Sequence, residues 1–95
     1  MGVSFHPEAQ AELEEAQEWY EERSVLAAAA FLRAVSTAVR HLAESPLRYP
    51  LSEHGTRHIL VERFPFTIFY RTHANEIVIV AVAHQKRRPN YWASR

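Results

Sequence analysis

The chain of 95 residues contains no cysteine and no aspartate, and it has only two glycines. Without cysteine, disulfides, thiolate metal sites and cysteine nucleophiles are excluded, and a reducing compartment such as the cytoplasm is expected. Glycine-rich phosphate loops and the HExxH and GxSxG patterns are also missing, so we expect no cofactor. Of the six histidines, only His54 and His58 have helical spacing, and no third ligand lies near them, so no metal site is expected.

Long hydrophobic runs are missing as well. The longest apolar run, residues 25–32, is far below the roughly 20 residues that a membrane-spanning helix needs, so we expect no membrane association. No apolar signal-peptide region follows the first residues. At this length and with 47% hydrophobic residues, the sequence predicts one domain, residues 1–95, around one core.

Charge of each sign is concentrated in one half of the chain, although the formal net charge is zero. Residues 1–47 contain three arginines against eight glutamates, whereas residues 48–95 contain eight lysines and arginines against three glutamates. The basic half is expected to attract an acidic protein surface or a nucleic acid, with an affinity that falls as the salt concentration rises.

Two helices are predicted in the acidic half, after a short strand at residues 3–5. Pro7 is typical of a helix start, and apolar residues follow at helical spacing as far as Tyr20. Ser24 can cap a second helix, which has the clearest apolar period in the chain and ends before Pro46. These patterns predict a helical hairpin.

Glutamates occupy the outer face of the first predicted helix, and several of them are four residues apart. The like-charged pairs at this spacing are Glu8/Glu12, Glu14/Glu18 and Glu18/Glu22. Each pair costs about 0.2–0.5 kcal/mol in an isolated helix. Two explanations are open: the face is solvated, or a basic segment of a partner lies against it.

The second half of the chain has the apolar patterns of strands. Three strands are expected, at residues 57–63, 66–71 and 77–83. Their short connections favour antiparallel pairing, and the continuous apolar run of the last is typical of a central strand covered on both faces. The predicted fold class is α+β: a short N-terminal strand, a helical hairpin, a three-stranded antiparallel sheet and a short basic and aromatic C-terminal tail.

Residues 84–92 combine cations, aromatics and a histidine directly after the last predicted strand. Lysine and arginine side chains can neutralise phosphates, tyrosine and tryptophan can stack on bases, and His84 can exchange a proton. Two interpretations of this segment are equally supported. It is a nucleic-acid site, or Tyr91 and Trp92 pack a short terminal helix against the sheet while the cations stay solvated.

Several short motifs occur together in this chain. They are Pro7 to Leu13 and Trp19-Tyr20, Arg63-Phe64-Pro65-Phe66, Ala81-Val82-Ala83-His84, and Arg88-Pro89 with Tyr91-Trp92. In this combination and order, the sequence resembles the RelE/ParE superfamily of bacterial toxins from type II toxin–antitoxin modules over nearly its whole length. The resemblance implies a cytoplasmic toxin that inhibits growth, of a kind linked to plasmid stabilisation, and a cognate antitoxin protein that neutralises it.

The resemblance leaves two targets open, because RelE-like members cleave messenger RNA in the ribosome while ParE-like members poison DNA gyrase. The nucleases carry basic side chains at positions that correspond to His58, Leu60 and Thr67, and the expected cations are missing there. For a nuclease, His84 and Tyr91 are the candidate catalytic residues for proton transfer. The incomplete set favours a ParE-like or otherwise non-nucleolytic toxin, and the alternative is that Arg57, Arg63 or Arg71 replaces the missing cations from a shifted position.

Whichever target applies, the residues expected to bind it are cations and one aromatic of the basic half. They are Arg57, Arg63, Arg71, Lys86, Arg87, Arg88 and Trp92. A further alternative belongs to another class of protein: a non-toxic module that only binds an antitoxin, since nothing in the sequence requires catalysis.

Overall fold

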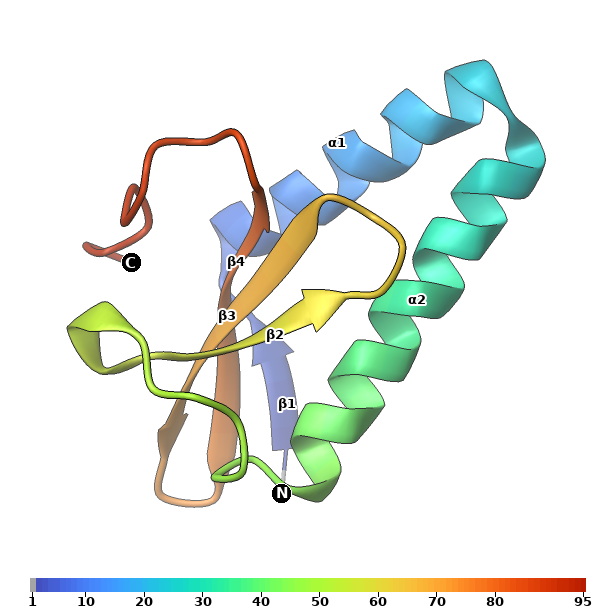
Figure 1. Ribbon diagram of the computed structural model, residues 1–95. Helices are drawn as coiled ribbons and strands as arrows, with labels where there is room; N and C mark the ends of the chain where they lie inside the picture. Colours follow the sequence, from blue (N-terminus) through green and yellow to red (C-terminus); the bar gives the residue numbers. More distant parts are fainter. Residues whose placement is uncertain (1) are drawn as a thin grey trace.

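The structure is a computed structural model that describes residues 2–95, with a helical hairpin packed on a four-stranded sheet (Figure 1). The elements in chain order are β1 (Gly2–Phe5), α1 (Pro7–Arg23), α2 (Val25–Glu44), the single 3-10 turn η1 (Glu53–Gly55), β2 (Arg57–Val61), β3 (Phe66–His73) and β4 (Glu76–His84). The sheet order is β1-β4-β3-β2. The predicted α+β class, helical hairpin and three antiparallel strands are confirmed.

The sheet has one strand more than the sequence predicts, because β1 pairs with β4 in parallel from Gly2↔Glu76 to Phe5↔Ile79. A parallel pair needs a long crossover connection, and here β1 and β4 are separated by every other element. The predicted boundary of β2 is also wrong. The strand ends at Val61, and Arg63, with a φ of 71°, already belongs to the turn before β3.

The helix boundaries have local causes in the sequence. The His6 ring accepts a hydrogen bond from the Glu8 backbone nitrogen at 3.1 Å, and Pro7 occupies the first turn of α1. Ser24 both ends α1 and begins α2, because its backbone nitrogen donates to the Tyr20 carbonyl while its hydroxyl accepts from the Ala27 nitrogen. The hairpin turn is therefore a single capping residue.

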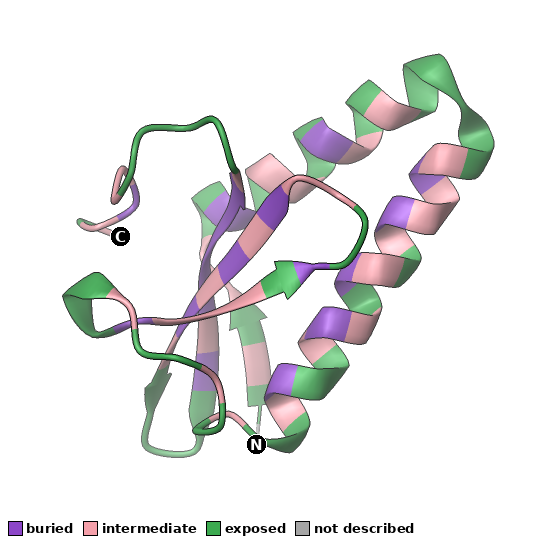
Figure 2. Cartoon of the chain, viewed as in Figure 1, coloured by how far each residue is buried: buried purple, intermediate pink, exposed green. Residues whose placement is uncertain are grey.

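The main core lies between the helices and one face of the sheet. In α2 one stripe of side chains is buried and faces the strands (Figure 2), namely Ala28, Phe31, Val35, Ala38 and Leu42. The Phe31 ring contacts three other aromatic rings, those of Tyr20, Phe64 and Phe66, at centroid distances of 5.1–5.3 Å. By length and composition α2 is apolar enough to cross a membrane. Its apolar residues Phe31, Val35, Ala38 and Leu42 instead lie in the main core.

A second, smaller cluster lies on the opposite face of the sheet. The β3–β4 register passes from Phe69↔Ala81 to Tyr70↔Ile79, so Val80 is an extra residue that bulges β4. Val80 and Ala81 consequently both belong to this outer cluster, together with Ala83 and Trp92. The prediction that the last strand is covered on both faces is confirmed.

The first testable consequence concerns the aromatic centre of the main core. Replacing Phe31 by alanine is expected to lower the free energy of unfolding by about 3–5 kcal/mol, because the buried ring leaves a cavity between both helices and β3. Urea denaturation followed by circular dichroism measures the loss.

Leu26 on the same helix is the matched control for Phe31. Its side chain is 81% exposed, so Leu26→Ala should change stability by less than about 0.5 kcal/mol. Equal losses in the two variants would contradict the assignment of Phe31 to the core.

Candidate functional site

The C-terminal tail, residues 85–95, turns back over the outer face of the sheet (Figure 1). It consists of consecutive turns and not of the predicted short helix. Trp92 is 2% exposed and stacks on Phe69 with ring centroids 4.5 Å apart. The loop around η1 contacts the same tail, since the Asn90 amide donates to the Glu53 carboxylate at 2.7 Å. The tail is therefore a packed part of the fold.

The carboxylate of Glu12, on α1, joins the tail to the body of the protein. Its Oε1 accepts from the Val82 backbone nitrogen at 3.0 Å and from Arg95 Nη1 at 2.9 Å. Its Oε2 accepts from the Tyr91 hydroxyl at 2.6 Å and from Arg95 Nη2 at 3.0 Å. Arg87 Nη1 lies 3.9 Å from the same oxygen. We call these residues, Glu12, Val82, Arg87, Tyr91 and Arg95, the carboxylate cluster.

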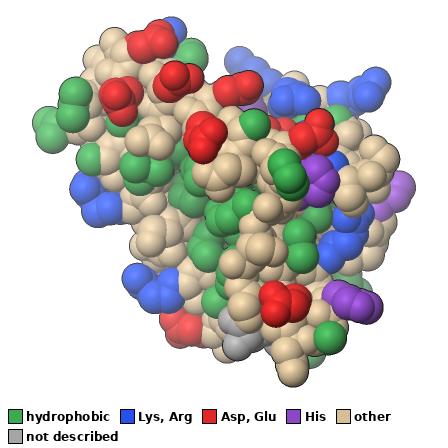
Figure 3. All heavy atoms as spheres, turned by 180° about the vertical axis from the view of Figure 1, so that it is seen from behind, with side chains coloured by type: hydrophobic (Ala, Val, Ile, Leu, Met, Phe, Trp, Pro, Cys, Tyr) green, Lys and Arg blue, Asp and Glu red, His purple; other side chains and the backbone are tan. Residues whose placement is uncertain are grey.

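The carboxylate cluster explains part of the glutamate face of α1. Arg95 lies between Glu8 and Glu12, with its Nε 3.2 Å from the Glu8 carboxylate. The cation that lies against Glu8 and Glu12 thus comes from the chain's own tail, and not from a partner. Glu14, Glu18 and Glu22 are exposed, as a solvated face requires, and Figure 3 shows several acidic side chains gathered at the upper left of the molecule.

The environment of the cluster changes the acidity of its members. Burial raises the pKa of the Tyr91 hydroxyl above its ordinary value, and the hydrogen bond to Glu12 and the charge of Glu12 raise it further. Burial by itself lowers the pKa of Arg95, but the hydrogen bonds and charge of Glu12 outweigh it, so that this pKa is raised. Both groups therefore stay protonated, one neutral and one cationic, throughout the physiological range.

Three of the residues expected to bind a target are used inside the fold. Arg71 donates to the carbonyl oxygens of Arg95 at 2.8 Å, His54 at 3.2 Å and Ala93 at 3.4 Å. Arg57 donates to the Tyr49 carbonyl at 2.7 Å. Together with the buried Trp92, these partly exposed side chains hold loops and tail in place.

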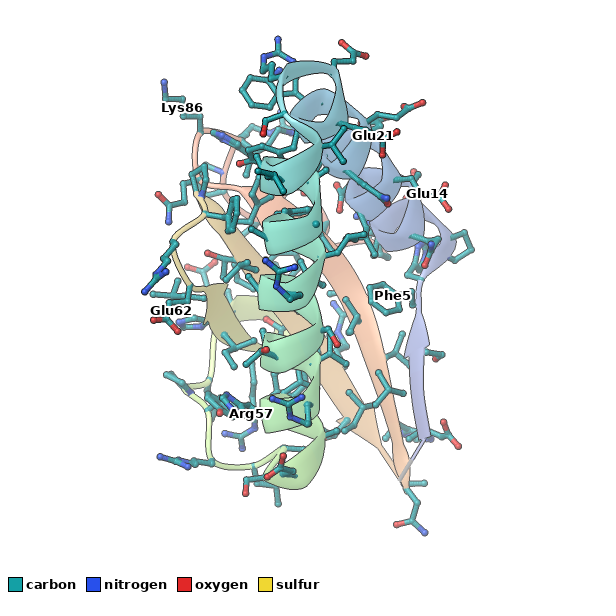
Figure 4. The ribbon with its side chains drawn as sticks, turned by 90° about the vertical axis from the view of Figure 1, so that its right-hand side faces the viewer. Phe5, Glu14, Glu21, Arg57, Glu62 and Lys86 are labelled. Atoms are coloured by element: carbon teal, nitrogen blue, oxygen red, sulfur yellow. The ribbon has the colours of Figure 1, made fainter. Side chains whose placement is uncertain are left out.

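The other four expected residues are exposed and lie near one end of the sheet. Arg63 is in the turn between β2 and β3, while Lys86, Arg87 and Arg88 are in the segment 85–88, which we call the basic loop. The two turns are adjacent, since the Gln85 nitrogen donates to the Pro65 carbonyl at 2.8 Å. Figure 4 shows Lys86 on the side of the molecule away from Glu14 and Glu21.

His84 lies at the end of β4, beside a groove of about 360 Å³ between α1 and the ends of β3 and β4. Its Nδ1 accepts a hydrogen bond from the Lys86 backbone nitrogen at 3.0 Å, and its ring stands edge-on to Phe66. His84 and Tyr91 also line one hollow of about 260 Å³ beneath the basic loop. The two candidate catalytic residues are thus near one another, but each already has a partner within the fold.

The three positions where nucleases carry cations point to the outer face of the sheet. This follows from the register, in which His58 pairs with Phe69 and Leu60 with Thr67. The His58 ring is held by Ser52, and Leu60 is exposed. Within residues 2–95, no three His, Cys, Asp or Glu side chains lie close enough to hold a metal ion.

The sequence analysis missed three residues of the carboxylate cluster: Glu12, Val82, which contributes only its backbone nitrogen, and Arg95. A signal for Glu12 was present, because it lies between Ala9 and Ala16 at helical spacing, on the apolar stripe of α1. A carboxylate in such a stripe requires a buried partner. No local pattern indicated that Arg95 supplies this partner.

The fold is that of small α+β domains known from toxin–antitoxin systems. A solved structure of the chromosomal ParDE toxin–antitoxin system from P. aeruginosa matches it with a TM-score of 0.64 and 22% sequence identity, over 88% of this chain and 95% of that chain. No curated protein sequence matches the chain.

The sequence model of the family described as ParE toxin of type II toxin–antitoxin systems, parDE, matches residues 3–89. The chain therefore belongs to the ParE toxin family, and it is the toxin component of a type II system with a cognate antitoxin as partner. The resemblance to the RelE/ParE superfamily is confirmed, and the ParE-like interpretation is supported over the alternatives.

A second testable consequence distinguishes structural from exposed arginines. Replacing Arg71 by methionine should lower the free energy of unfolding by about 1–3 kcal/mol, because three carbonyl oxygens lose their donor. Arg88→Met removes an exposed guanidinium from the tail that Arg71 contacts, and it should change stability by less than about 0.5 kcal/mol. Urea denaturation compares them, and an Arg71 variant as stable as the Arg88 variant would refute the structural role.

Proposed function

We propose that this toxin acts in the cytoplasm on DNA gyrase and leaves messenger RNA intact. The observation that carries the proposal is the state of the Tyr91 hydroxyl, which donates to the buried Glu12 carboxylate and has a raised pKa. Tyr91 is the residue that matches the tail tyrosine of the nucleases. In this chain its hydroxyl is committed to holding the tail.

The charges on the outer face of the sheet support the same conclusion. Cleavage of RNA passes through a phosphorane-like state with extra negative charge, which a nuclease stabilises with nearby cations. The strands β2 and β3 contribute Arg71 to that face, and its guanidinium already donates to three carbonyl oxygens. Proton transfer by His84 alone would contribute only about 10²–10⁴-fold.

The distribution of exposed charge supports a target with negative surface. Lys86 and Arg88 are exposed in the basic loop, and Arg63 lies in the adjacent turn. Gyrase binds DNA, so the phosphates of the bound DNA add negative charge beside the protein surface. A loop of cations can bind there through long-range attraction and without catalysis, with an affinity that depends on salt.

The proposal predicts the outcome of two assays on the induced toxin. Primer extension on messenger RNA should reveal no cuts at ribosomal A sites, while purified toxin should inhibit supercoiling by gyrase. Tyr91→Phe, which removes only the hydroxyl, should leave messenger RNA as intact as the unaltered toxin does.

Discrete cuts in messenger RNA that vanish in Tyr91→Phe would overturn the proposal in favour of a ribosome-dependent nuclease. The absence of growth arrest from the unaltered chain, together with tight binding of the antitoxin, would instead indicate a non-toxic binding module.

The basic loop should be required for growth arrest. Exchanging Lys86 and Arg88 for glutamate reverses two exposed charges, and it should reduce supercoiling inhibition by about tenfold or more without changing thermal stability. The matched control exchanges Arg33 and Arg48, which are exposed elsewhere, and has the same change in net charge. Equal loss of inhibition in both double variants would show that only total charge matters.

A further inference from the structure

We propose that Glu12 is the positioning residue of the toxin: its buried carboxylate sets the placement of the basic loop without itself contacting the target. The inference rests on the proposed function in one respect, namely that the basic loop engages the target. It concerns a helix residue that is 11% exposed at its side chain and that belongs to no surface expected to bind a partner.

The first support is convergence of three chain segments on one carboxylate. Glu12 comes from α1, Val82 from β4, and Tyr91 and Arg95 from the tail, and all their hydrogen bonds to Glu12 are between 2.6 and 3.0 Å. Hydrogen bonds to an ionised acceptor are roughly twice as strong as those between neutral groups. This carboxylate therefore ties the tail to α1 and β4, in addition to the contacts of Trp92 and Arg71 with the tail.

The second support is the balance of charge around the Tyr91 ring. The guanidinium carbon of Arg87 lies 3.9 Å from the ring centroid, and that of Arg95 lies 5.1 Å from it. Two like charges are thus held beside one ring, with the Glu12 carboxylate between them as their common counter-ion. Without this negative charge, Arg87 and Arg95 repel each other, and Arg87 belongs to the basic loop.

The third support is the edge of β4 beyond the end of β1. The strand β1 stops pairing at Phe5↔Ile79, and the His6 nitrogen adds a last bond to the Ile79 carbonyl. From there the side chains of the cluster continue the pairing: Arg95 Nη1 donates to the Val80 carbonyl at 3.0 Å, and Glu12 accepts from Val82. These hydrogen bonds fix the position of the tail relative to β4.

The basic loop is restrained at its start, where the backbone nitrogens of Lys86 and Arg87 donate to the ring and the carbonyl of His84, both at 3.0 Å. Its first residue is tied to the β2–β3 turn through the Gln85 nitrogen, and its far side is tied through Arg87 and Tyr91 to Glu12. Lys86 and Arg88 make no side-chain ion pair within residues 2–95. Loosening the carboxylate cluster therefore frees the loop at one end while its cations remain available.

This arrangement predicts a particular change in the dose response. If the loop is correctly placed in only about a tenth of the molecules, the apparent affinity for the target falls about tenfold, because binding selects the competent fraction. Maximal inhibition is unchanged, since every cation is still present. Reversing Lys86 and Arg88 removes the binding charges themselves, so it lowers the affinity and also makes the affinity depend less steeply on salt concentration.

The test uses Glu12→Gln in the full chain, purified away from its antitoxin. Glutamine has nearly the same shape and can still accept from Val82, but it lacks the charge that balances Arg87 and Arg95. Amide hydrogen exchange should become about tenfold faster in residues 85–95 and stay unchanged in β3. The concentration for half-maximal inhibition of supercoiling, and the inducer dose for growth arrest, should rise about tenfold at unchanged maximal effect.

Glu18→Gln is the matched control, because Glu18 lies on the same helix and is exposed. It should leave tail exchange and both dose responses unaltered. Antitoxin binding by Glu12→Gln, measured by titration calorimetry, should also be unchanged, a result that general unfolding would not give. If Glu12→Gln does not fold, Tyr91→Phe serves instead. It removes one hydrogen bond, so exchange in the tail and the half-maximal concentration should each rise about threefold, and not tenfold.

Two results would overturn the inference. Tail exchange as slow in Glu12→Gln as in the control would show that the carboxylate does not hold the tail, and full potency with a loosened tail would show that placement is irrelevant. The double variant of Lys86 and Arg88 distinguishes failure of this inference from failure of the proposed function. If that variant keeps its growth arrest, the basic loop is not the target-binding surface.

Discussion

The hydrogen bonds of the Glu12 carboxylate connect the beginning of this protein to its end. A carboxylate that is largely removed from water is stable only when its charge is compensated and its oxygens are hydrogen-bonded. Here Arg95, Tyr91 and a backbone amide of β4 meet this requirement. Because the partners come from the last residues of the chain, the tail has to return across the sheet, and Trp92 closes the outer face in doing so.

This constraint explains why the sheet has a core on each face. The helical hairpin covers one face with a large aromatic and aliphatic cluster, and the tail covers part of the other with a small one. The bulge at Val80 lets β4 serve both clusters, since it places two consecutive small residues on the outer side. In so short a chain, covering both faces of one strand raises the buried apolar area that stability depends on.

Folding also divides the cations of the basic half into two groups. Arg57, Arg71 and Arg95 donate to carbonyl oxygens or to the Glu12 carboxylate, so they stabilise the fold. Lys86 and Arg88 remain free for a partner. The residues that catalysis would require, a free phenol and cations on the outer face, are among those used for structure. Under the function proposed above, we expect a toxin built in this way to act by binding, with a potency that depends on how firmly its basic loop is held.

The sequence by itself determined the helical hairpin and the three antiparallel strands, because caps, periodicity and short turns are local signals that neighbouring residues carry. The family of toxins was indicated by the resemblance of several short motifs in their order along the chain. The contrast between an acidic first half and a basic second half was visible in the same way. Only the tertiary structure decided that β1 pairs with β4, that Trp92 is buried, and that Arg71 supports the tail while Lys86 stays free. These outcomes depend on contacts between distant residues, above all that of Glu12 with Arg95, and a charged side chain looks the same in the sequence whether its partner is solvent, a target or its own chain.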